Sequence, residues 1–292
     1  MFIYIVPQVS DIFVETYTAE YGTLQVTDDA TCLFVRDEKL YTAKSAGSVD
    51  RVVKSGRLMR SGSNIVNVGN LAYHSDIKGL TSYHYDGLET VYTPETLENI
   101  TSEALSKEKA EAYPVKKAVS GQAESGDVIF KIVNNQKWYL VCWLKPETAD
   151  RYKEGKSVIV DFRDGENGSE GTQLKMHIDS ISTQGGEIRM ILSCNRHYED
   201  FARYRTKECT LIASRTSGIF LETSSLVEED GQVGVYVVDK LGNYNFTPVR
   251  ILRQDGAVTV VEKNYFYDAE GNSVKTVQNY YTILRPQAEE EE

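Results

Sequence analysis

Regularly spaced glycines between short apolar runs are the feature that most limits what this chain can fold into. They lie within residues 41–89, three in a first half and two in a second half. In each half a glycine precedes a short run of alternating apolar residues, and another glycine follows eight or nine residues later. Because glycine has no Cβ, it can adopt positive φ and turn tightly between strands. The motif glycines are Gly47, Gly56, Gly62, Gly79 and Gly87.

Two similar halves that each present one apolar face can bury it by packing against each other. The first half includes the apolar positions of 49–53 and 65–68, and the second half spans 75–87. Short strands with one buried face form a two-layer structure. The stretch therefore predicts a small sandwich of two β-sheets.

Composition favours β-structure and excludes several classes of partner. The chain has 292 residues, 43 of them acidic and 32 basic, for a net charge of -11. Such a chain should not bind nucleic acid or anionic lipid head groups. Tyrosine is abundant, and Val, Ile and Thr recur with period two, which favours strands. We find no apolar run of 18 or more residues, the length that a complete membrane span needs.

The remainder of the chain alternates between one helical segment and two strand-rich segments. Thr93 followed by Pro94 is typical of a helix start, and apolar residues then recur at helical spacing up to Leu105. We expect one or two short helices there, as a solvated connector rather than a partner-binding helix. Strand patterns occupy most of 118–213 and 214–286, and the acidic end, 287–292, is predicted to be disordered.

This organisation resembles that of periplasmic adaptor proteins, the membrane fusion proteins of the HlyD-type and RND-related families. The resemblance implies a mainly β chain with a barrel-sandwich hybrid (lipoyl-like) domain at 21–92, a helical linker at 93–117, a β-barrel domain at 118–213 and a membrane-proximal β domain at 214–286. Residues 1–20 form a lead-in. The phrases that carry it are Tyr21–Leu24, Val35–Glu38, Gly155–Val160, Gly234–Val238 and Pro248–Arg250.

The connection between the two halves departs from the family pattern. In adaptors of this type a long helical hairpin is inserted there, and its tip docks on an outer-membrane channel. Here only Gly69–Asp76 joins the halves, and so few residues cannot build a coiled coil. The resemblance thus implies an adaptor without the hairpin. An envelope scaffold linked to cell division or wall machinery is the alternative that this loss favours.

A third reading is a true lipoyl or biotinyl carrier. A carrier needs a lysine at the tip of the turn between the halves, where the swinging cofactor is attached. The connection Asn67–His74 contains no lysine, so we expect a structural sandwich that binds no cofactor.

The resemblance also places the protein at a membrane. Met1–Val6 is short, apolar and followed at once by Pro7. It could be a first strand, but we expect the outer end of an N-terminal anchor whose earlier part is missing from this chain. The implied location is the extracytoplasmic face of the cell membrane. The implied partners are proteins of an envelope transport complex and, as a possibility, further copies of the chain.

Chemically competent residues are few, and we expect neither a metal site nor catalysis. Two His-x-Asp pairs, His74 with Asp76 and His84 with Asp86, could each place both side chains on one face of a strand. We interpret them as exposed turn positions. The acidic, glycine-rich segment 161–170 lacks the spacing of a calcium loop, and we expect a mobile loop.

The four cysteines show no paired metal-ligand spacing. Cys32 and Cys142 lie in apolar strands, where a thiol behaves as a small hydrophobe. Cys194, close to His197, could suggest a thiol nucleophile, but no third group is identified to orient it. Cys194 and Cys209 could lie on neighbouring barrel strands, and the sequence leaves open whether they pair.

Overall fold

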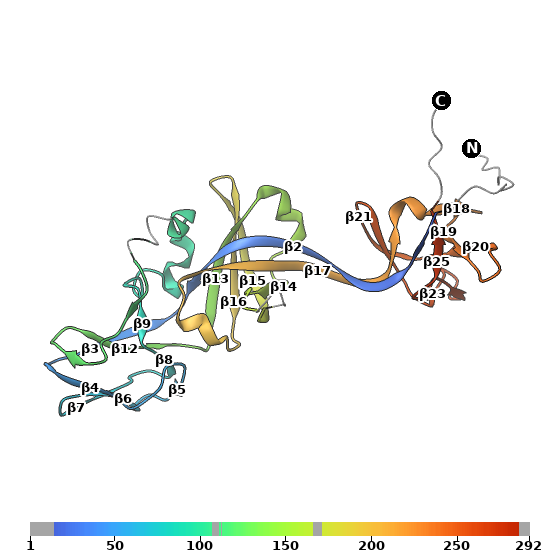
Figure 1. Ribbon diagram of the computed structural model, residues 1–292. Coiled ribbons are helices and arrows are strands. Elements are labelled where there is room, and N and C mark those ends of the chain that lie inside the picture. The colour runs from blue at the N-terminus through green and yellow to red at the C-terminus, as the bar shows by residue number, and fades with distance from the viewer. Residues whose placement is uncertain (1–14, 107–110, 112, 166–170, 286–292) are drawn as a thin grey trace. The chain divides into compact units, whose positions relative to one another are not determined.

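The computed structural model describes residues 15–106, 111, 113–165 and 171–285, and almost all of its regular structure is β-strand (Figure 1). The chain divides into two compact units. One comprises Val26–Ser214, and the other combines 15–25 with 215–285. The mainly β fold class is confirmed. No helix in the described ranges has the length and apolar character needed to cross a bilayer. Residues 1–6, with the expected anchor end, and the acidic tail 287–292 lie outside the described residues.

The predicted sandwich forms from two four-stranded antiparallel sheets. The first sheet has the order β3 (Glu38–Thr42), β12 (Val128–Val133), β8 (Gly79–Ser82) and β5 (Leu58–Met59). The second has the order β11 (Gln122–Ala123), β4 (Gly47–Arg51), β6 (Asn64–Val68) and β7 (Leu71–His74). Their apolar faces share one core, in which Ile65 and Val68 of β6 join Phe130 and Ile132 of β12. Val49 packs against the same core.

Each sheet of the sandwich takes two strands from the first four, β3 to β6, and two from the last four, β7, β8, β11 and β12. The second half therefore extends beyond 75–87, since it includes β7, β11 and β12, and the segment 84–117 interrupts it. The sequence analysis placed β12 in the barrel domain, but β12 pairs with β3 and β8. Nearly every residue of β12 is buried, because the strand lies between two cores. Val133 and the neighbouring Leu80 belong to the barrel core, whereas Phe130 belongs to the sandwich core. A strand buried on both faces shows no alternation that would assign it to one domain. The exact domain boundaries stay a prediction.

The inserted segment begins and ends in a short ladder between β9 (His84–Tyr85) and β10 (Lys116–Lys117). Its two predicted short helices are 3-10 helices, η1 (Pro94–Asn99) and η2 (Ser102–Leu105). The prediction of a solvated connector is wrong, because Leu97 and Ile100 are buried against Val141 and Ile191 of the barrel wall. Their burial removes apolar surface from water on both sides of the contact.

Six strands close into a barrel, in the order β14 (Ser157–Asp161), β15 (Gln173–Gln184), β16 (Glu187–Cys194), β13 (Trp138–Leu144), β2 (Glu20–Val35) and β17 (Thr206–Glu222). The pairing of β14 with β17 completes the ring, so these strands have no free edge between them. Stacked rings of Phe34, Trp138, Phe162 and Tyr198 fill the interior. The short helices η3 (Pro146–Arg151) and η5 (Glu199–Ala202) belong to the same unit.

The other unit is built from both parts of the chain that flank the barrel and sandwich. β1 (Thr16–Thr18) pairs with β25 (Thr282–Leu284), and Arg285 binds Glu222 through Nε at 2.8 Å and Nη2 at 2.5 Å. A core that includes Ala19, Ile219, Val235 and Ile283 lies beneath this pairing. The remaining elements are η6 (Thr223–Ser225), β18 (Val227–Glu229), β19 (Gln232–Val238), β20 (Tyr244–Pro248), β21 (Ile251–Asp255), β22 (Val258–Val261), β23 (Tyr265–Tyr267) and β24 (Ser273–Lys275).

Candidate functional site

The motif glycines serve two different structural purposes. Gly56, Gly62 and Gly87 have positive φ, at 79°, 84° and 86°, a region that residues with a Cβ avoid. Gly47 and Gly79 do not, which corrects the expectation of positive φ at all five. A Cβ on Gly47 would lie 2.8 Å from the backbone nitrogen of Gly69, and one on Gly79 would meet the backbone carbonyl of Val133. These two glycines permit close approach of neighbouring strands.

The turn between the halves is as short as a hairpin connection can be. Gly69 and Asn70 alone separate β6 from β7, and Gly69 has a φ of 56°. Its N–H donates to the carbonyl of Ser48 at 2.9 Å, which fixes the turn against β4. Leu71, at its base, is 46% exposed. This tip holds neither an acceptor lysine nor a helical hairpin.

A cluster of six buried charged side chains lies where sandwich, insertion and barrel meet. We call it the junction cluster: Arg36, Glu38, Asp86, Glu89, Lys131 and Arg205. Glu38 is at its centre, with Oε1 at 3.0 Å from Nε of Arg36 and 2.9 Å from Nζ of Lys131. Its Oε2 accepts from Nη2 of Arg205 at 2.7 Å. Three cations and three carboxylates make the cluster neutral.

The insertion supplies two of those three carboxylates. Asp86 Oδ2 accepts from Nε of Arg205 at 2.8 Å, while its Oδ1 accepts from the N–H of Leu88 at 2.8 Å. Glu89 accepts the N–H groups of Asp86 and Gly87, both at 2.9 Å, and lies 3.4 Å from Lys131. The loop 86–89 is thus held by its own carboxylates while they neutralise cations from the other two regions.

The pairing within the junction cluster determines the protonation states of its side chains. Burial raises the pKa of Glu38, but Arg36, Arg205 and Lys131 outweigh it and hold that pKa well below its usual range. Burial alone would also raise the pKa of Asp86. The hydrogen bond from Arg205 outweighs this effect, so the pKa of Asp86 lies below its usual value. Burial lowers the pKa of Arg36 to about 10 despite the attraction of Glu38. Near neutral pH all three groups are charged.

The two His-x-Asp pairs do not come together as a metal site. Asp76 forms an ion pair with Lys39, and its N–H donates to the Tyr41 hydroxyl at 2.8 Å. Asp86 is buried and paired with Arg205, so the expectation that it occupies an exposed turn position is wrong. His74 is exposed on β7, whereas burial and nearby cations lower the pKa of His84. Within the described ranges no group of three or more His, Cys, Asp and Glu side chains is arranged to hold a metal ion.

The cysteines are all buried and unpaired by disulfides. Three of them meet in the barrel core, where the neighbouring thiols of Cys142 and Cys209, together with burial, raise the pKa of Cys32. Burial raises the pKa of Cys194, whose Sγ accepts the N–H of Arg196 at 3.3 Å. Thiols with raised pKa values are poor nucleophiles, so the geometry does not support a thiol reaction at Cys194.

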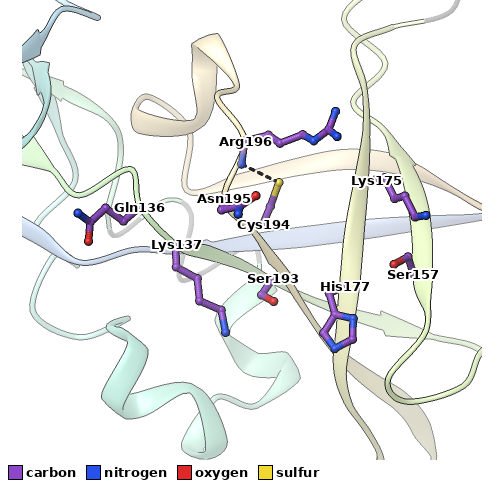
Figure 2. Close-up of a pocket in the computed structure, with 9 residues that line it drawn as sticks. All are labelled: Gln136, Lys137, Ser157, Lys175, His177, Ser193, Cys194, Asn195 and Arg196. Carbon is purple, nitrogen blue, oxygen red and sulfur yellow. Dashed lines mark hydrogen bonds between the residues drawn. The ribbon is translucent and has the colours of Figure 1, made fainter.

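A pocket of about 390 Å³ opens on the barrel and includes Cys194 (Figure 2). It lies over adjacent strands, because Ser157 of β14 pairs with His177 of β15 and His177 pairs with Ser193 of β16. Lys137, Lys175 and Arg196 also line it. Sequence analysis missed this site, since its residues come from four separate segments and form no local motif.

Comparison with protein-family models gives two matches in chain order. Residues 38–134 match the RND related, barrel-sandwich hybrid domain, and residues 138–215 match the RND related, beta-barrel domain. Together they cover more than half of the chain. The chain belongs to the RND-related family. The predicted resemblance to RND-related adaptors without the helical hairpin is confirmed.

Solved structures similar to this RND-related protein share little sequence with it. ZneB from Cupriavidus metallidurans is 8% identical, with 99% of this chain and 97% of that chain covered and a TM-score of 0.32. MacA from Actinobacillus actinomycetemcomitans is 12% identical, with coverage of 94% and 100% and a TM-score of 0.36. A putative efflux transporter from Bacteroides eggerthii is 11% identical, with coverage of 83% and 87% and a TM-score of 0.36. A search of curated proteins gave no match.

Proposed function

We propose that this RND-related protein is a non-enzymatic adaptor on the extracytoplasmic face of a cell membrane. It would act by assembling with protein partners of an envelope transport complex, and membrane attachment would come through an N-terminal anchor. Binding rather than catalysis would be its mechanism, with each domain presenting a surface to a partner.

The observation that carries this proposal is the matched pair of RND-related domains in family order. The nesting of the chain supports it. The sandwich is contained within the sequence of the barrel, and the barrel lies within that of the unit formed by 15–25 and 215–285. The barrel and the unit of 15–25 and 215–285 are therefore each built from two segments of the chain, one before and one after the module that they enclose in sequence. Such a chain can hold its domains in series without a separate linker for each.

Crosslinking in membranes tests the proposal. The full-length gene product would be expressed in its native host, crosslinked, purified and analysed by mass spectrometry. Recovery of an ABC or RND transporter is the expected result. An exposed sandwich variant, Leu71→Glu, should lower the recovery if the tip contacts the partner, whereas Leu241→Glu in the other unit provides a matched control at an exposed leucine.

The tight turn at Gly69 and Asn70 favours a second candidate, an envelope scaffold associated with cell division or wall synthesis. A two-residue turn cannot reach a distant channel in the way that a long hairpin does. In the same crosslinking experiment, recovery of division or wall proteins without a transporter would select the scaffold and reject the transport role.

A further inference from the structure

The basic pocket on the barrel has the chemistry of a binding site for a phosphate group. Four of its lining side chains can carry positive charge: Lys137, Lys175, His177 and Arg196. None of its lining residues is acidic, although the whole chain has a net charge of -11. Because the protein as a whole is acidic, a cluster of basic side chains at one place suggests that they attract an anion there.

One carboxylate outside the pocket balances part of this charge. Asp179 Oδ2 lies 3.2 Å from Nζ of Lys137, and its Oδ1 accepts the Ser193 hydroxyl at 2.6 Å and lies 3.9 Å from Nε2 of His177. Lys175 and Arg196 make no ion pair within the described ranges. Two positive charges therefore remain uncompensated.

The backbone that carries Arg196 is fixed rather than loose. Its carbonyl accepts the indole N–H of the fully buried Trp138 at 2.9 Å, and its N–H donates to Cys194 Sγ at 3.3 Å. Figure 2 shows the Arg196 side chain extending from this anchored turn above Cys194, while Lys175 and His177 project from β15, the strand that pairs with β16. The cations thus come from strand β15 and from the anchored turn that follows the neighbouring strand β16.

The match of charge and donors identifies the ligand class. A phosphate monoester carries about -1.5 to -2 charges at neutral pH and three strong acceptor oxygens, which suits two uncompensated cations. Arginine and lysine bind phosphate through charge-assisted hydrogen bonds, and the Ser157 hydroxyl and the Asn195 amide, also in the lining, add neutral donors. A single carboxylate would leave one cation unbalanced. We propose that this pocket binds a phosphate group, either free or as a small ester, and this inference is independent of the adaptor role.

Isothermal titration of the full chain with inorganic phosphate tests the site, at constant ionic strength and with acetate as the comparison anion. We expect saturable binding with one site and a Kd on the order of 1 mM, since exposed charge pairs are individually weak. Lys175→Ala combined with Arg196→Ala should weaken binding about tenfold or more. The control, Lys54→Ala combined with Arg57→Ala in the sandwich, removes the same charge elsewhere and should change the Kd less than about twofold.

Equal weakening by both double variants, equal affinity for acetate, or no saturation with any phosphate probe would overturn the proposal. Two further probes separate the sources of the phosphate group. Glycerol 3-phosphate represents a soluble ester, and vesicles of phosphatidic acid in phosphatidylcholine represent a lipid head group. Binding of either that is lost in the pocket variant and kept in the control supports the site and identifies its source. Circular dichroism melting of each variant checks that it is folded.

Discussion

The junction cluster and the basic pocket both gather charged side chains in the unit 26–214, but they differ in burial and in balance. The junction cluster contains equal numbers of cations and carboxylates, all of them buried. The pocket has more cations than the single Asp179 can neutralise, and its cations are exposed. Because buried charge must be paired while exposed charge need not be, the first cluster is structural and the second is free to bind an external anion.

Removal of one partner from the junction cluster should have the largest effect. Glu38→Ala leaves three buried cations facing two carboxylates, and loss of one member of a buried pair costs about 3–5 kcal/mol. Chemical denaturation should show this loss in the free energy of unfolding. Arg196→Ala, which removes an exposed charge from the pocket, is the control. A cost below about 1 kcal/mol for Glu38→Ala, typical of surface pairs, would contradict the assigned structural role.

Loss of apolar contact beneath the insertion should have the next largest effect. Leu97 is buried against the barrel wall, and truncation of buried leucine costs about 2–5 kcal/mol. Leu97→Ala should therefore lower the free energy of unfolding by an amount in this range, whereas Leu71→Ala, at an exposed leucine, should change it by less than about 0.5 kcal/mol. Equal effects would show that the insertion does not depend on apolar burial to bring Asp86 and Glu89 to the junction.

The sandwich could be predicted from the sequence, but the junction cluster could not. Glycine spacing and alternating apolar residues predicted the sandwich, because both are local patterns that can be recognised within a few consecutive residues. Nothing in the local sequence marks Arg36 and Glu38 as buried, although both of their side chains are fully buried. Their partners Asp86, Lys131 and Arg205 lie 48 or more residues away from Glu38. Charged residues are usually exposed, so only the tertiary structure reveals that these bury one another.

The pH dependence of stability should further distinguish the buried junction cluster from the exposed basic pocket. The pKa values of Glu38 and Asp86 are lowered in the folded state, so the folded state binds protons less readily than the unfolded state. Their stabilising contribution is complete above the unfolded pKa values of about 4 and is lost as the pH falls through the lowered folded values. Melting temperature should thus fall steeply below about pH 4. Glu38→Gln should reduce this dependence, and an unchanged slope would contradict the assignment.

The smallest expected effect on stability is at the pocket, where the prediction is near zero. Exposed substitutions away from packed features change the free energy of unfolding by about 0.5 kcal/mol or less. Lys175→Ala with Arg196→Ala should remain within that range without phosphate, because neither side chain has an ion-pair partner to lose in the described ranges. Phosphate should then raise the melting temperature of the original protein and not that of the variant, since a ligand stabilises only a state that binds it. If the double variant were strongly destabilised without ligand, these cations would be part of the scaffold, and the distinction between a balanced structural cluster and an unbalanced binding site would fail.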